Sequence, residues 1–170
     1  REIEDKYPNI TIKPNKLWTE ENLALVLEGL DILLQDVMGG DMRKFLKAFG
    51  DVEFRAKGMG SDPFTWGYVN VNKTGVIYIT EVAFMLDSRV IETTIHELGH
   101  VMDIHRFDRS GSAYFHVMTG SSCDGPYNAL CDDFQPVGVF VSYHAMTLPA
   151  EDFAETFAAF SIWKSKDEAS

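Results

Sequence analysis

Apolar residues recur every three to four positions in the longest patterned segments of the chain, which is the spacing of a helix buried on one side. The first predicted helix spans about 19–38, where Thr19 is a capping residue and Gly39-Gly40 ends it. Its apolar stripe consists of Leu23, Val26, Leu27, Leu30, Leu33, Leu34 and Val37. The same reasoning predicts a short helix over 41–49, a helix from about 87 to 105, and a last helix from Pro149 to about Trp163.

Short runs rich in branched and aromatic residues predict strands at about 10–12, 52–56, 68–71 and 75–80. The last two flank Asn72-Lys73-Thr74 and read as a hairpin. Gly-rich segments at 58–63 and 106–140 are expected to be loops. Because the strands are grouped between helices, the pattern predicts an α+β domain. Its length of 170 residues fits one domain, 1–170.

The net charge and the length of the apolar runs argue against two classes of protein, those that bind nucleic acids and those that span a membrane. The formal net charge is −11, and an acidic surface repels phosphate backbones, so no nucleic-acid partner is expected. No apolar run approaches the roughly 20 residues of a transmembrane helix. We expect a monomer. Cys123 and Cys131 either form a disulfide or remain free thiols, and the sequence leaves both alternatives open.

The strongest chemical signal is His96-Glu97-Leu98-Gly99-His100 on the predicted helix 87–105. Residues four apart share a helix face, so both imidazoles can reach one ion. Zinc lowers the pKa of a water molecule, and Glu97 beside the histidines can take the proton. The helix also has a predicted core stripe, opposite the two histidines, formed by Ile91, Ile95, Leu98 and Met102.

A catalytic zinc ion normally takes a third protein ligand. Glu151 and Glu155 are candidates because they share one face of the last helix, and Glu155 stands alone in an apolar stretch expected to be buried. The residues alone do not decide between them. His105 has the wrong spacing for a ligand and suits the end of its helix, while Asp103 either orients a ligand histidine or is a solvated helix acid.

The motif helix, followed by Ser142-Tyr143 and then by Glu151-Asp152-Phe153-Ala154-Glu155, resembles the gluzincin metallopeptidases. The pattern is most similar to the group that contains the anthrax lethal factor catalytic domain and the Pro-Pro endopeptidases, and it covers about residues 75–163. The resemblance implies that His96, His100 and Glu151 bind zinc, with Glu155 in contact with a ligand. It also implies that Tyr143 faces the metal, where a phenol can stabilise an oxyanion. His144 is the alternative donor, and one extra residue between Tyr143 and Glu151 departs from the pattern.

The resemblance further implies a zincin-like α+β fold. Its parts are a small, mostly antiparallel, twisted sheet, an active-site helix with HExxH, and a C-terminal helix with the third ligand. By analogy, the strand 76–80 would form the upper edge of the cleft. The expected function is that of a zinc-dependent endopeptidase acting on a peptide or protein substrate. The alternatives are a metal-dependent hydrolase of a non-protein amide and an inactive zinc-containing binding module. A secreted or cell-surface location is expected from this resemblance and from the start at Arg1.

Overall fold

The computed structural model describes residues 2–60, 63–70, 75–107 and 148–167. Its elements, in chain order, are α1 (Glu2–Lys6), β1 (Ile10–Ile12), α2 (Glu20–Asp31), the π-helical turn η1 (Ile32–Val37), α3 (Met42–Phe49), β2 (Val52–Lys57), β3 (Gly67–Val69), β4 (Val76–Thr80), the 3-10 turn η2 (Ala83–Met85), α4 (Asp87–Phe107) and α6 (Pro149–Asp167). The predicted α+β class is therefore confirmed. Helix α1 was not predicted, and α6 extends past its predicted end at Trp163.

Capping residues set the helix starts as the sequence indicates. The hydroxyl of Thr19 accepts a hydrogen bond from the Asn22 N–H at 3.1 Å, and the carboxylate of Asp41 accepts from the Arg43 and Lys44 N–H groups. Both caps satisfy backbone donors that have no partner inside a helix. As a result, α2 begins directly after Thr19 and α3 directly after Asp41, as the sequence predicts.

The four described strands form a mixed sheet in the order β1-β2-β4-β3. Pairs β1–β2 and β2–β4 are parallel, and only β3–β4 is antiparallel. The expectation of a mostly antiparallel sheet is therefore wrong. The reason is the helical connection: α2, η1 and α3 lie between β1 and β2, and a crossover of that length returns the chain in a parallel direction.

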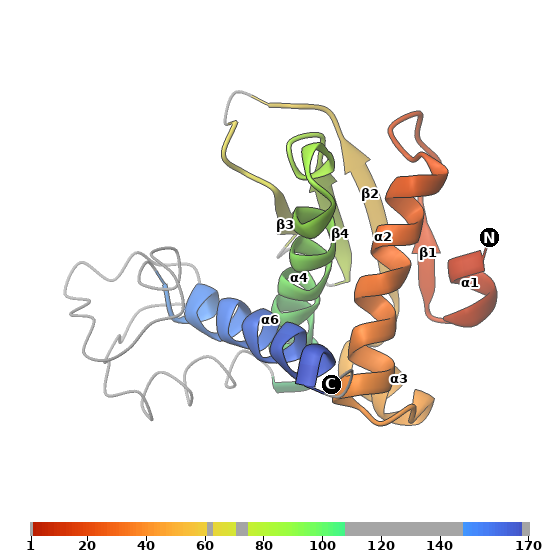
Figure 1. Cartoon of the computed structure of the whole chain (residues 1–170), viewed down its shortest axis with the longest axis vertical. Coiled ribbons are helices and arrows are strands. Elements are labelled where there is room, and N and C mark those ends of the chain that lie inside the picture. Colours follow the sequence, from red (N-terminus) through yellow and green to blue (C-terminus); the bar gives the residue numbers. More distant parts are fainter. Residues whose placement is uncertain (1, 61–62, 71–74, 108–147, 168–170) are drawn as a thin grey trace.

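The hairpin of β3 and β4 agrees with the prediction in direction, with Tyr68 opposite Tyr78. However, β4 is paired on both sides, so it does not form the edge of the sheet as the analogy suggested. Strand β3 occupies that edge, at the opposite end of the sheet from β1 (Figure 1). Any peptide that extends the sheet next to α4 must therefore pair with β3.

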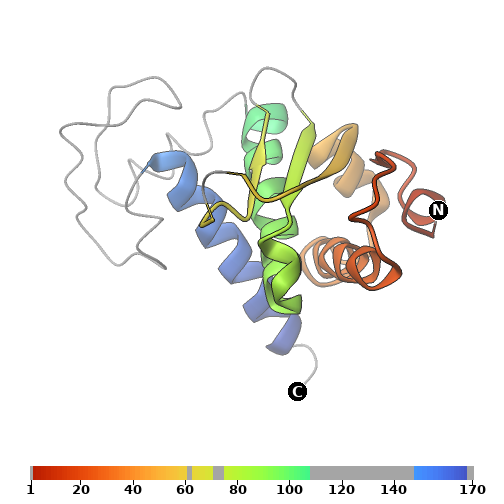
Figure 2. The same cartoon turned by 90° about the horizontal axis from the view of Figure 1, so that it is seen from above.

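Helix α4 lies at the centre of the molecule, with α6 on one side and α2 on the other (Figures 1 and 2). The sheet turns the alternate residues Val52, Phe54, Ile77 and Ile79 toward the helices, and all four are buried. They pack with Val26, Leu30 and Leu33 of α2 and η1 and with Val90, Ile95 and Leu98 of α4 in one core cluster. Burying apolar surface on both sides of α4 fixes the position of the helix that carries the motif.

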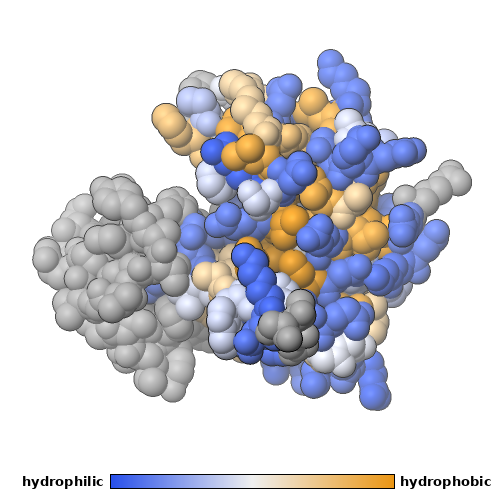
Figure 3. Space-filling model, viewed as in Figure 1, coloured by the Kyte–Doolittle hydropathy of each residue, from blue (hydrophilic) through white to orange (hydrophobic). Residues whose placement is uncertain are grey.

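On the face shown in Figure 3, hydrophilic side chains cover much of the described surface, with hydrophobic ones between them. Within the described residues, no helix has the length and apolarity to span a membrane.

Candidate metal centre

Helix α4 carries His96, Glu97 and His100 on adjacent turns, as the motif predicts. The predicted core stripe is correct, because Ile95 and Leu98 are fully buried and Ile91 and Met102 partly so. The opposite side is not solvent-facing, however: Glu97 is only 4% exposed and His100 only 8%. Polar groups at that depth require compensating partners, and helix α6 supplies them.

A close approach between α4 and α6 is made possible by Gly99. A Cβ atom at this position would lie 3.2 Å from Ala154 Cα and 3.1 Å from the ring of Phe157. Only a glycine leaves room for the α6 backbone to come this near to the middle of the motif. Since Glu151 lies one turn before Ala154, this contact brings its carboxylate to the two histidines.

His96, His100 and Glu151 converge on one point. The Nε2 atoms of the two histidines are 3.0 Å apart, and Glu151 Oε2 is 3.2 Å from His96 Nε2 and 3.4 Å from His100 Nε2. Tetrahedral zinc with bonds of about 2.0–2.1 Å holds its ligand atoms about 3.3–3.5 Å apart. Two imidazole nitrogens and a carboxylate oxygen are also the donor set of catalytic zinc sites. The cluster therefore fits a metal ion in both chemistry and spacing.

Glu155 approaches the other side of a ligand ring. Its Oε1 is 3.5 Å from His96 Nδ1, the nitrogen that points away from the cluster. Glu151, not Glu155, shares its oxygen with both Nε2 atoms. The geometry thus separates the two glutamates that the residues alone left open: Glu151 belongs to the group that could hold a metal ion, and Glu155 contacts the other nitrogen of the His96 ring.

The carboxylate of Glu97 lies beneath the edge strand. A Cβ atom on Gly67 of β3 would be 3.0 Å from Glu97 Oε1 and 2.5 Å from the Thr93 methyl group. A side chain at position 67 would therefore collide with α4. The missing side chain lets β3 lie directly over Glu97, so the edge strand and the Glu97 carboxylate adjoin each other.

Two further acids on α4 and α6 have raised pKa values. Burial, followed by the charge of Glu155, raises the pKa of Glu92, while His96 and Arg89 oppose the shift. Burial raises the pKa of Asp152 to about 6, and a hydrogen bond with Thr156 opposes this. Sequence reasoning missed Asp152, which is 3% exposed, because an acid in a first helical turn is ordinarily solvated.

The remaining sequence predictions have different outcomes. Asp103 is completely buried, so the alternative of a solvated helix acid is wrong. His105 is exposed in the last turn of α4 and packs on Gly50, away from the cluster. The predicted burial of the apolar stretch around Glu155 is only partly correct, since Ala154 and Ala158 are buried but Phe160 is exposed. Other predictions lie outside the described residues, namely those for Tyr143, His144, Cys123 and Cys131.

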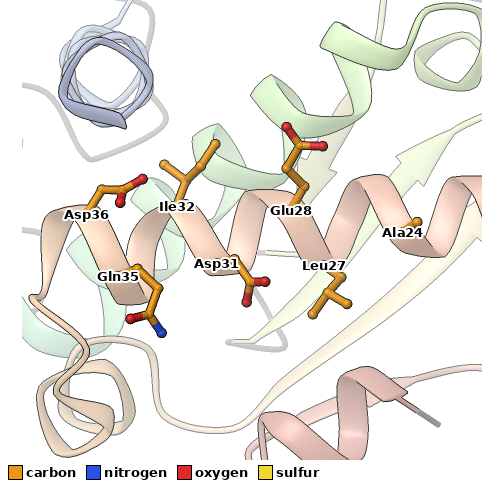
Figure 4. Close-up of a pocket in the computed structure, with 7 residues that line it drawn as sticks. All are labelled: Ala24, Leu27, Glu28, Asp31, Ile32, Gln35 and Asp36. Carbon is orange, nitrogen blue, oxygen red and sulfur yellow. The ribbon is translucent and has the colours of Figure 1, made fainter. Parts of the chain in front are cut away.

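A separate groove of about 340 Å³ runs along α2 and η1 (Figure 4). It contains three acids, but Glu28 and Asp36 point to one side of the helix in this view and Asp31 to the other. Asp31 is also held by Lys6 and by the hydroxyl of Tyr7. Because its acids diverge, this groove lacks the convergent donors of the His96–His100–Glu151 cluster.

No protein-family model, curated protein or solved structure matches the chain.

Proposed function

We propose that this chain is a zinc-dependent endopeptidase, with His96, His100 and Glu151 as the metal ligands and Glu97 as the general base. The observation that carries the proposal is the meeting of three ligand atoms, spaced 3.0–3.4 Å apart, on the same helix turns that present Glu97. Glu97 lies between the two histidines in the sequence but is not one of the three proposed ligands. A purely structural metal site normally has four protein ligands and needs no such free carboxylate, so Glu97 favours a hydrolytic site.

When bound, zinc supplies Lewis acidity, which polarises a carbonyl group and lowers the pKa of water. The protein supplies the proton transfer. Glu97 takes a proton from the attacking water onto its carboxylate and delivers it to the amine that leaves. Its burial at 4% exposure keeps bulk water from competing for that proton. Glu155, 3.5 Å from His96 Nδ1, holds that ring in the orientation that turns Nε2 toward the cluster.

The edge strand supports a peptide substrate in particular. An extended peptide can add to an exposed sheet edge through backbone hydrogen bonds. Among the four described strands, β3 is such an edge, and its Gly67 lies against Glu97. A peptide paired with β3 therefore has its backbone beside the proposed base, where hydrolysis requires it.

The test is cleavage of a peptide library by the zinc-loaded protein, read by mass spectrometry. We expect cleavage that a chelator abolishes and that zinc restores. Glu97→Gln is nearly isosteric but cannot accept a proton, so it should bind zinc normally and lose at least about 100-fold in turnover. Glu28→Gln, the same change at an exposed site on α2, is the matched control and should cleave normally. Equal activity of Glu97→Gln and the control would refute the proposed mechanism.

A further inference from the structure

The outer side of β3 carries backbone groups that β4 does not use. The Asn70 N–H donates to Val76 O at 2.9 Å, and the Thr80 N–H donates to Trp66 O at 2.8 Å. Hydrogen-bonded pairs alternate along an antiparallel ladder, so Tyr68 is bonded toward β4. The N–H and C=O groups of Gly67 and Val69 consequently point away from β4, toward the side of β3 on which no described strand lies. An added strand would pair with these two residues.

Tyr68 projects from the opposite face of the sheet from Gly67 and Val69, because side chains alternate along a strand. Its ring stacks on that of Tyr78, with centroids 4.7 Å apart and planes inclined by 12°. Since Tyr78 belongs to β4, the other face of the Tyr68 ring is turned toward the open edge. Two cations hold the phenol ends: Lys57 Nζ donates to the Tyr68 hydroxyl at 3.0 Å, and Arg55 donates to that of Tyr78 at 3.1 Å.

We infer that Tyr68 determines specificity by selecting an aromatic side chain in the bound peptide, one or two residues from the bond that is cleaved. This inference rests on the proposed peptidase function. If the peptide pairs antiparallel to β3, its residue opposite Tyr68 forms a non-hydrogen-bonded pair, in which Cα atoms are about 4.5 Å apart and side chains are in close contact. Its ring would stack on Tyr68 and extend the pair of rings to three.

The distance from the cleaved bond follows from the neighbouring position. A peptide residue opposite Gly67 faces α4, where Gly67 lies against Glu97. The residue opposite Tyr68 is the next one along the peptide, about 3.3 Å further on, and so lies one or two residues from the cleaved bond. Lys57 donates to the Tyr68 hydroxyl and Arg55 pairs with Glu53, so both cations lie at the phenol ends and leave the face of the Tyr68 ring to a stacking partner.

The experiment uses pairs of peptides derived from a cleaved sequence, with Phe or Ala placed in turn at each of the positions around the cleaved bond. The zinc-loaded wild type should prefer Phe at one of these positions by about 2- to 10-fold in kcat/KM. Tyr68→Ala should lose this preference, and Tyr68→Phe, which keeps the ring, should retain it. Zinc affinity of both variants should equal that of the wild type. If Tyr68→Ala does not fold, Tyr68→Leu serves with the same expected loss.

A binding measurement gives an independent readout. In the zinc-loaded Glu97→Gln protein, which binds peptides without cleaving them, the added change Tyr68→Ala should weaken binding of the Phe peptide by about 2- to 10-fold. The Phe and Ala peptides should then bind with equal affinity. Cleavage by the wild type with an unchanged Phe preference in Tyr68→Ala would overturn this inference and leave the proposed function standing. Failure of the zinc-loaded wild type to cleave any peptide would overturn both.

Discussion

Replacing Gly99 by alanine should weaken zinc binding without touching a ligand. The new Cβ atom would lie 3.2 Å from Ala154 Cα and 3.5 Å from Ala154 Cβ. Carbon atoms pack at about 3.5–4.0 Å, so the α6 backbone must retreat by about 0.5 Å. Metal–ligand distances tolerate only about 0.2 Å. Because Glu151 lies one turn from Ala154, we expect a loss in zinc affinity of about 10- to 100-fold, as for residues that support ligands.

Stability should change less than affinity. Overpacking costs about 1–3 kcal/mol, and alanine is favoured over glycine in a helix by about 1 kcal/mol. The expected net loss is therefore about 0–2 kcal/mol in the free energy of unfolding, measured by urea denaturation of the metal-free protein. Zinc affinity is measured by competition with a chromophoric chelator.

Gly29→Ala is the matched control. Its Cβ atom would meet Thr94 Cγ2 at 3.0 Å and Ile91 O at 3.3 Å, so it crowds α2 against α4 to a similar degree. No residue of the cluster lies on α2, and zinc affinity should stay close to that of the wild type. The reasoning is refuted if Gly99→Ala binds zinc as tightly as the wild type, or if both variants lose affinity equally.

Three further predictions concern residues of β3 and α6. Glu151→Ala should lose more zinc affinity than Glu155→Ala, because only Glu151 shares an oxygen with both ring nitrogens; chelator competition that gives the reverse order would contradict this assignment. Gly67→Ala should retain zinc but lose peptide cleavage, since its Cβ would displace β3 from Glu97, and normal cleavage rates would contradict the close contact. The pKa of Asp152 is raised from 3.8 to about 6, so the native state binds more protons than the unfolded state between these values and stability falls as pH rises through them. In the metal-free protein, Asp152→Asn should therefore gain about 1–3 kcal/mol over the wild type between pH 4 and 7 in urea denaturation, and a constant difference would count against the shift.

Features that depend on residues near one another in the chain could be predicted from the sequence. The caps at Thr19 and Asp41, the apolar stripe of α4 and the spacing of His96 and His100 are all local, and each agrees with the structure. The pairing of β3 with β4 belongs to the same class, because a short connection constrains it.

Features that depend on how distant elements dock could not be predicted in this way. Nothing local to β4 indicates that it is paired on both sides and that β3 takes the edge. The burial of Asp152 and of Asp103 likewise arises from packing around their helices and not from their neighbours in sequence. The choice between Glu151 and Glu155 required the resemblance, since both lie on one face of α6, and only the docking of α6 at Gly99 distinguishes them in space.

Every catalytic step proposed above requires one ion at the His96–His100–Glu151 cluster. The most direct test is titration of the metal-free wild-type protein with zinc in competition with a chromophoric chelator. The account predicts binding of one zinc ion per chain, and loss of that binding in His100→Ala, because two of the three distances in the cluster involve His100 Nε2. Absence of zinc uptake by the wild type, or uptake that is unaffected by His100→Ala, would contradict it.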